Sequence, residues 1–140
     1  MAMFKQSARL RSAADLTPLL DVWSVQLAWS DKARFQIELA LEELVVNTFN
    51  HGQSAGSTAQ AEPICIDVAA QQDGADLTIE LKDNATAFDP TQFTPPDVTL
   101  SAEDRKIGGL GLFFASKMMD SIQYTRDGSV NHLLLRKRLV

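Results

Sequence analysis

The stretch FQIELALEELVVNTFNHG, residues 35–52, is the part of the chain from which the fold is read. It predicts a long helix that begins near Ser30 or Asp31, both good N-cap residues, and ends near residue 50. At about 100° per residue, its polar side chains form one stripe with apolar residues on both flanks. The members of this stripe are Gln36, Glu43, Asn47 and Asn50. We expect the stripe to be partly buried and to need hydrogen-bond partners. From this helix alone, a solvated stripe or an internally satisfied network is the simpler interpretation.

The segments around this helix predict an α+β fold. Alternating apolar residues indicate strands, a 3.6-residue period indicates helices, and the polar run 52–62 indicates a loop. The other expected elements are a strand (3–10), a helix (17–28), strands (63–70 and 77–81), a helix (108–119) and strands (121–125 and 130–139). This order predicts helices layered on one face of a mixed sheet.

Length and composition limit the class of protein. The chain has 140 residues, which predicts a single domain over 1–140. Thirteen Lys and Arg against eighteen Asp and Glu give a net charge of −5, which argues against a general nucleic-acid binder. Cys65 is the single cysteine, which rules out an intrachain disulfide and fits a reducing compartment. Because no apolar run approaches about 18 residues and no secretion signal is present, we expect a cytoplasmic protein without membrane contact.

Two further motifs have side chains suited to a ligand. In LKDNATAFDP, residues 81–90, Asp83 directly follows an apolar strand, where its carboxylate could accept a hydrogen bond from a ligand amine. An Asx-turn, in which the side chain satisfies its own backbone, is the simpler interpretation. In IGGLGLFF, residues 107–114, glycines open a helix whose free N–H groups could bind an anion. Arg105 and Lys106 lie just before it and could add positive charge, although a plain loop-to-helix turn explains the glycines equally well.

The three motifs together, in this order and spacing, resemble the N, G1 and G2 boxes of the GHKL ATPase superfamily. The segments ELVVNTFNHG (43–52), DNATAFDP (83–90) and DRKIGGLGL (104–112) are most similar to the bacterial anti-sigma-factor serine kinases. The resemblance extends from about residue 5 to 138. It implies a two-layer α/β sandwich of the GHKL (Bergerat) type. A sensor histidine kinase would need an additional dimerisation and phosphoacceptor region.

The resemblance implies a role for each matching residue. Asn47 matches the asparagine that holds Mg²⁺ between the nucleotide phosphates, and Glu43 matches the proposed general base. The i, i+4 spacing of these two residues puts them on one face of the helix. Asp83 matches the aspartate that reads the adenine amino group. Gly109 and Gly111 match the glycines that allow the lid to close and that donate N–H groups to phosphate.

The expected ATP lid covers residues 84–107, with Arg105 as a candidate phosphate contact at its far hinge. The expected ATP-binding residues are Asn47, Asn50, Asp83, Ala85, Arg105, Gly108, Gly109, Leu110, Gly111 and Leu112. The chain departs from the family pattern at Ala85, where the family usually has glycine. It also has Asn131 near the place where the family often carries Ser or Thr beside the adenine pocket, which makes Asn131 a further candidate.

The activity implied by the resemblance is transfer of the γ-phosphoryl group of Mg²⁺-ATP to a Ser or Thr of a STAS-type anti-sigma antagonist. The implied partners are this antagonist, a sigma factor and a second copy of the chain in a homodimer. Two alternatives stay open. One is a nucleotide-binding regulatory module with little or no kinase activity, and the other is a partner-switching kinase that acts outside sigma-factor control.

Overall fold

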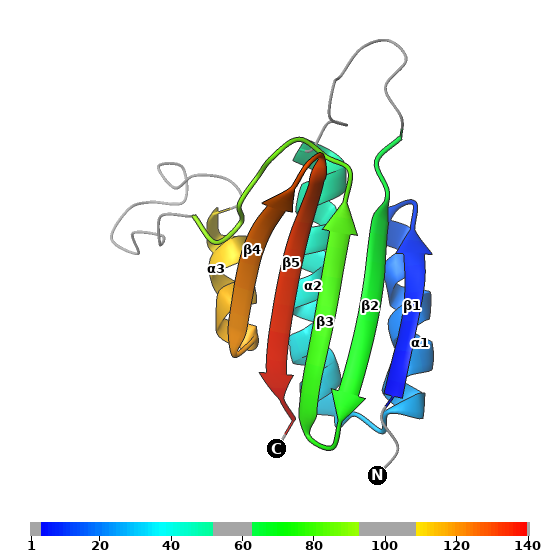
Figure 1. Ribbon diagram of the computed structural model, residues 1–140. Coiled ribbons are helices and arrows are strands. Elements are labelled where there is room, and N and C mark those ends of the chain that lie inside the picture. Colours follow the sequence, from blue (N-terminus) through cyan, green and yellow to red (C-terminus); the bar gives the residue numbers. More distant parts are fainter. Residues whose placement is uncertain (1–3, 52–62, 93–108, 140) are drawn as a thin grey trace, which may run out of the picture.

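A computed structural model of the chain describes residues 4–51, 63–92 and 109–139 (Figure 1). The first helices and strand are β1 (Phe4–Leu10), the short 3-10 helix η1 (Ala13–Asp15), α1 (Leu16–Gln26) and α2 (Asp31–His51). They are followed by β2 (Ile66–Asp73), β3 (Asp76–Asp83), α3 (Gly109–Met118), β4 (Ser121–Asp127) and β5 (Val130–Arg138). The predicted cap is present, since the backbone N–H of Ala33 donates to Ser30 Oγ at 3.1 Å. The expected Arg105, Gly108 and most of the expected lid lie outside the described residues.

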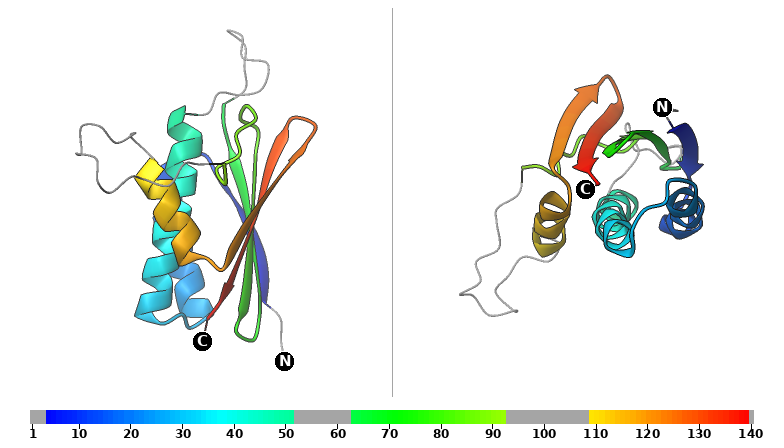
Figure 2. Two further views of the ribbon diagram at one scale, coloured as in Figure 1. Left: turned by 90° about the vertical axis from the view of Figure 1, so that its left-hand side faces the viewer. Right: turned by 90° about the horizontal axis from the view of Figure 1, so that it is seen from below.

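The elements form two layers, with α1, α2 and α3 on one face of the sheet (Figure 2). This arrangement confirms the α+β sandwich. The sheet order within the described ranges is β1-β2-β3-β5-β4. Each neighbouring pair is antiparallel, so the prediction of a mixed sheet was wrong. The crossover through α3 does bring β4 back parallel to β3. However, β5 lies between these two strands and is antiparallel to both.

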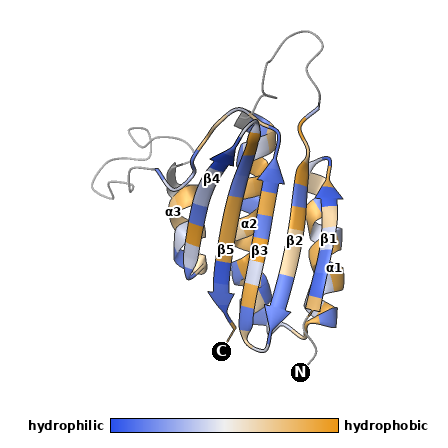
Figure 3. Ribbon diagram, in the orientation of Figure 1, coloured by the Kyte–Doolittle hydropathy of each residue, from blue (hydrophilic) through white to orange (hydrophobic). Residues whose placement is uncertain are grey.

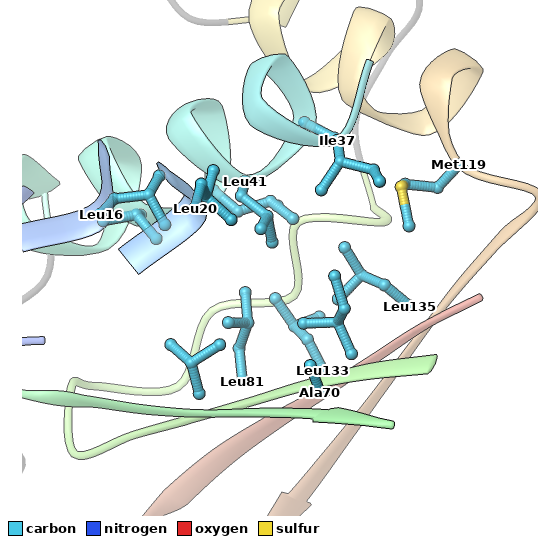
Figure 4. Close-up of a cluster of buried hydrophobic side chains, with 14 of the residues drawn as sticks. Leu16, Leu20, Ile37, Leu41, Ala70, Leu81, Met119, Leu133 and Leu135 are labelled. Atoms are coloured by element: carbon cyan, nitrogen blue, oxygen red, sulfur yellow. The ribbon is translucent and has the colours of Figure 1, made fainter. Parts of the chain in front are cut away.

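The core lies between α2 and the inward side of the sheet. Hydrophobic and hydrophilic residues alternate along β3, which directs one set of side chains to the helices (Figure 3). Leu81, Leu133 and Leu135 from the strands face Ile37 and Leu41 of α2 (Figure 4). Fully burying such a side chain contributes about 1.5–3 kcal/mol. The core therefore fixes α2 relative to the ends of β3 and β5.

The ends of α3 and of the hairpins are held by specific contacts. Lys137 Nζ donates to the carbonyl of Met118, the last residue of α3, at 2.6 Å. Burial lowers the pKa of Lys137, and the nearby carboxylate of Asp120 partly opposes this effect. Gly74 and Gly128 have positive φ angles of 61° and 59° at the turns of the β2–β3 and β4–β5 hairpins. No helix within the described ranges has the length and apolarity needed to cross a membrane.

Candidate nucleotide site

The C-terminal half of α2, the end of β3 and the start of β5 meet at one end of the molecule (Figure 1). Residues of these three elements line a pocket. Its volume is about 120 Å³. The lining residues are Leu44, Asn47, Thr48, Asp83, Ala85, Thr86, Ala87, Phe88, Pro90, Asn131 and Leu133. The strand register brings Asp83 and Asn131 opposite one another, although 48 positions separate them in the sequence. The long helix and the strand end identified from the sequence therefore line one pocket.

Asp83 is the buried carboxylate of this pocket, with 8% of its surface exposed. Its Oδ1 atom accepts the backbone N–H of Ala85 at 2.9 Å, which is the Asx-turn contact expected as the simpler interpretation. The same oxygen accepts Asn131 Nδ2 at 2.9 Å. No described residue donates to Oδ2. One oxygen of Asp83 is therefore used by the fold, and the described residues leave the other, also an acceptor, without a donor.

Asn84 is turned away from the pocket by contacts with the chain before β2. Its Oδ1 atom accepts the backbone N–H of Cys65 at 2.9 Å, and its Nδ2 atom donates to the carbonyl of Pro63 at 3.0 Å. These bonds connect the end of β3 to the entry of β2. They hold the turn in which Asp83 points inward.

Asn131 is the centre of a hydrogen-bond network beside Asp83 and is 4% exposed. Besides its bond to Asp83, its Nδ2 atom donates to the carbonyls of Thr86 at 2.9 Å and Ala85 at 3.3 Å. Its Oδ1 atom accepts Tyr124 Oη at 2.5 Å and Arg126 Nη1 at 2.9 Å. The structure therefore brings the candidate Asn131 into direct contact with Asp83.

Tyr124 and Arg126 are network residues that the sequence did not single out. The signal that could have found them is the alternation along residues 121–127, which puts both on the inward side with Ile122. Arg126 Nη1 also donates to the carbonyl of Ala85 at 2.9 Å, and its Nε donates to the carbonyl of Gly128 at 3.1 Å. Arg126 thus connects the β4–β5 hairpin to the segment after β3.

Ala85 replaces the usual family glycine without backbone strain. Among the described residues, Ala28 is the one non-glycine residue with a positive φ angle, so Ala85 adopts a conformation open to ordinary residues. Its side chain is buried, with 3% of the residue exposed, and it lines the pocket. The departure from glycine therefore fills space at the pocket wall rather than distorting the chain.

The polar stripe of α2 reaches this pocket in part. Asn47 is half-buried and lines the pocket, and Glu43 is half-buried one helical turn earlier. Asn50 is exposed and does not line the pocket. No described residue forms a hydrogen bond with the side chain of Glu43 or Asn47, so the described residues contain no network that satisfies these two. Gln36, near the start of the stripe, is also half-buried.

The first turn of α3 packs directly against Glu43. A Cβ atom added at Gly111 would lie 2.0 Å from Glu43 Oε2 and 2.6 Å from its Cδ atom. The absence of a side chain at Gly111 is therefore what leaves room for this carboxylate. Gly109 and Leu110 begin the same helix, and Leu112 lines a neighbouring hollow of about 240 Å³ with Leu44 and Pro90. The second and third motifs thus meet the first on α2.

The family model of the histidine kinase-like ATPase domain matches residues 6–137 of this sequence. The chain belongs to this family. Among its relatives is the serine/threonine-protein kinase BtrW of Bordetella bronchiseptica, which is 29% identical over 129 residues, 92% of this chain and 87% of that protein. The serine-protein kinase RsbW of Listeria monocytogenes is 27% identical over 112 residues, 77% of this chain and 68% of that protein. These findings confirm the resemblance to the bacterial anti-sigma-factor serine kinases.

A solved structure supports the fold of this histidine kinase-like ATPase domain. The crystal structure of the RsbU and RsbW domains of Rv1364c from Mycobacterium tuberculosis superposes with a TM-score of 0.61 at 16% identity. The match covers 96% of this chain and 32% of that longer chain. At this identity the comparison concerns the fold, and it agrees with the GHKL-type sandwich described above.

The described part of this ATPase domain contains no group of three or more His, Cys, Asp and Glu side chains that could hold a metal ion. Mg²⁺ commonly binds proteins through one or two side chains, with substrate phosphates and water completing its octahedron. The side-chain oxygen of Asn47, which no described residue engages, suits such a shared site. The side-chain oxygen of Asn47 therefore fits a metal ion that is shared with nucleotide phosphates.

Proposed function

We propose that this chain is an ATP-dependent protein kinase that phosphorylates a Ser or Thr of a STAS-type anti-sigma antagonist. The observation that carries the proposal is that Asp83 and Asn47 line one pocket, with Glu43 one turn before Asn47 on the same helix. No described residue donates to Asp83 Oδ2. The Asp83 carboxylate suits the amine of ATP, and the Asn47 amide suits its phosphates. The Glu43 carboxylate suits the reacting hydroxyl of the ATP-dependent transfer.

The proposed binding mode follows from the walls of the pocket. Apolar side chains of Leu44, Ala85 and Leu133 border the space beside Asp83, which suits a planar purine. Asp83 Oδ2 would accept the N–H of the adenine amino group. Asn47 would hold Mg²⁺ together with the phosphates, and the bound ion would neutralise charge that develops on them. Gly111 and the other glycines of the third motif would supply backbone N–H groups to phosphate.

In the proposed reaction, Glu43 accepts the proton of the attacking hydroxyl group. The hydroxyl oxygen of the acceptor attacks the γ-phosphorus, the bond from this phosphorus to the bridging oxygen breaks, and ADP leaves. The hydroxyl proton passes to the Glu43 carboxylate, which later releases it to solvent. Because Gly111 has no side chain, the Glu43 carboxylate fits beside the first turn of α3 and can keep the position proposed for a base.

The proposed partners follow from the family resemblance. The kinase would hold a sigma factor inactive until unphosphorylated antagonist displaces the sigma factor, and phosphorylation would dissociate the antagonist again. A homodimer in the cytoplasm is the proposed working form. The alternatives are a nucleotide-binding module with little kinase activity and a kinase that acts outside sigma-factor control. The following test separates the first of these from the proposal.

A thermal-shift titration with Mg²⁺-ATP, Mg²⁺-ADP and Mg²⁺-GTP tests the nucleotide site. A ligand at about 100 times its dissociation constant stabilises its target by ~2.7 kcal/mol, which is a shift of several degrees in a domain of this size. We expect a shift with the adenine nucleotides that weakens when EDTA removes Mg²⁺. No shift with any nucleotide would contradict the proposal. ATP binding without γ-phosphoryl transfer to STAS-type antagonists would favour the nucleotide-binding module.

A further inference from the structure

We infer that Tyr124, Arg126 and Asn131, here called the hairpin clamp, are positioning residues that make the pocket selective for a purine carrying a 6-amino group. The inference rests on the proposed function, namely that Asp83 receives the base of ATP. It adds a task for two side chains of β4 that touch no part of the proposed nucleotide themselves.

The polarity of the clamp is set by the donors and acceptors around the Asn131 amide. Its nitrogen faces only acceptors, namely Asp83 Oδ1 and the carbonyls of Thr86 and Ala85. Its oxygen faces Arg126, which carries donors and no acceptor. An amide turned the other way would put oxygen against oxygen on one side and nitrogen against a cation on the other. Asn131 is therefore fixed as a donor to Asp83.

The consequence for Asp83 is that its two oxygens have different tasks. Oδ1 receives two donors from the protein, and Oδ2 receives none from the described residues. The oxygen left to the ligand is an acceptor, so it matches the N–H of a 6-amino group and opposes the O6 carbonyl of hypoxanthine or guanine. A site built to receive one hydrogen-bonding group rejects an analogue of the opposite polarity strongly.

Arg126 holds both the Asn131 amide and the chain after β3 in place. The same Nη1 atom donates to Asn131 Oδ1 and to the carbonyl of Ala85, both at 2.9 Å. Charge-assisted hydrogen bonds are roughly twice as strong as neutral ones, so Arg126 is the strongest donor in the clamp. Removing it leaves the turn that orients the Asp83 carboxylate without its charged support.

The experiment compares the dissociation constants of Mg²⁺-ATP and Mg²⁺-ITP by calorimetry in the full chain. ITP differs from ATP at the 6-position, where it carries a carbonyl in place of the amino group. In Arg126→Met we expect the preference for ATP over ITP to fall about tenfold, mainly through weaker ATP binding. Tyr124→Phe, which removes one hydroxyl, should lower the preference about threefold.

Arg136→Met is the matched control, because Arg136 is an exposed arginine of the same hairpin, on β5. This variant should keep the ATP/ITP preference of the parent chain. Melting temperatures show whether each variant is folded, and Tyr124→Phe decides the question if Arg126→Met does not fold. Equal losses for ATP and ITP, which leave the preference unchanged in both clamp variants, would overturn this inference and leave the proposed function intact. No ATP binding by the parent chain would overturn both.

Discussion

The two ends of the candidate nucleotide site differ in how far the chain satisfies its own polar groups. At the end proposed to bind adenine (the adenine end), Asp83 and Asn131 are almost fully buried and share bonds with two side chains and the backbone. At the end proposed to bind the phosphates (the phosphate end), Glu43 and Asn47 are half-buried, and no described residue forms a hydrogen bond with either side chain. The described residues therefore organise the first end and leave the side chains of the second unpaired.

This difference indicates which end of the site should control nucleotide selectivity and which end should control turnover. Buried polar groups that are internally paired hold one geometry, because an alternative arrangement leaves a group unsatisfied. The adenine end should therefore control which nucleotide binds. Polar groups without internal partners can engage the reacting atoms, so the phosphate end should control turnover. The four predictions below test this division, from the largest expected effect to the smallest.

Replacing Glu43 with Gln should lower the rate of γ-phosphoryl transfer about 10²–10⁴-fold, because the amide cannot accept the hydroxyl proton. The dissociation constant of ATP should stay within about threefold, since Glu43 has no part in the adenine end. Labelled phosphate on a STAS-type acceptor measures the rate, and calorimetry measures binding. Glu42→Gln is the control, because Glu42 is the exposed neighbour on α2. Transfer at the parent rate by Glu43→Gln would remove the proposed base.

Replacing Asp83 with Asn should raise the dissociation constant of ATP about 10–100-fold, because a bond from the ligand amine to a charged acceptor is lost. Folding should also weaken, since Oδ1 accepts two bonds in the native chain. Asp127→Asn is a suitable control, because Asp127 is an exposed residue at the turn of the β4–β5 hairpin. If the Asp83 variant bound ATP as the parent does, the assignment of the adenine end would be wrong.

Replacing Gly111 with Ala should lower phosphoryl transfer about tenfold, because the new methyl group displaces the Glu43 carboxylate and small misplacements of catalytic groups are costly. ATP binding should change little, since alanine keeps the backbone N–H. The double variant Gly111→Ala with Glu43→Asp should regain part of the lost rate relative to Glu43→Asp alone, because the aspartate is one methylene shorter. If ATP affinity fell as much as the rate, Gly111 would act through phosphate binding and not through the position of Glu43.

Replacing Ala85 with Gly should have the smallest effect. Because Ala85 has no positive φ angle, glycine gives no relief of strain and only adds freedom to the unfolded chain, at a cost of about 0.4–1 kcal/mol. The affinity for ATP should stay within about threefold. Chemical denaturation and calorimetry measure the two quantities. A tenfold gain in affinity would mean that the alanine methyl group obstructs the nucleotide.

The fold was largely predictable because its segments have clear periods and stops. The alternation along β2 and the apolar flanks of α2 placed these elements within a few residues of their observed bounds. Glu43, Asn47 and Asp83 were found because helical spacing and a strand end are local features. The order of strands was less accessible, since the sequence predicted a mixed sheet, whereas β5 lies between β3 and β4 and is antiparallel to both.

Asn131 was a candidate from the sequence, but the other two members of the hairpin clamp were not, because the geometry of the clamp depends on long-range register. Tyr124 and Arg126 become neighbours of Asp83 only through two strand pairings, in which Asn131 lies opposite both Asp83 and Arg126. Likewise, the contact between Gly111 and Glu43 depends on how α3 packs on α2. Alternation predicts which side chains point inward, but not which distant residue they meet.

The position of β5 in the sheet determines when the pocket can form during synthesis of the chain. On the ribosome, α2 and β3 emerge before β5, although β5 is the strand that covers the edge of β3 and supplies Asn131 and Leu133. Until it arrives, β3 exposes an unpaired edge and Asp83 lacks its main side-chain partner. A growing chain therefore lacks the pocket that Asn131 and Leu133 line until β5 has been synthesised.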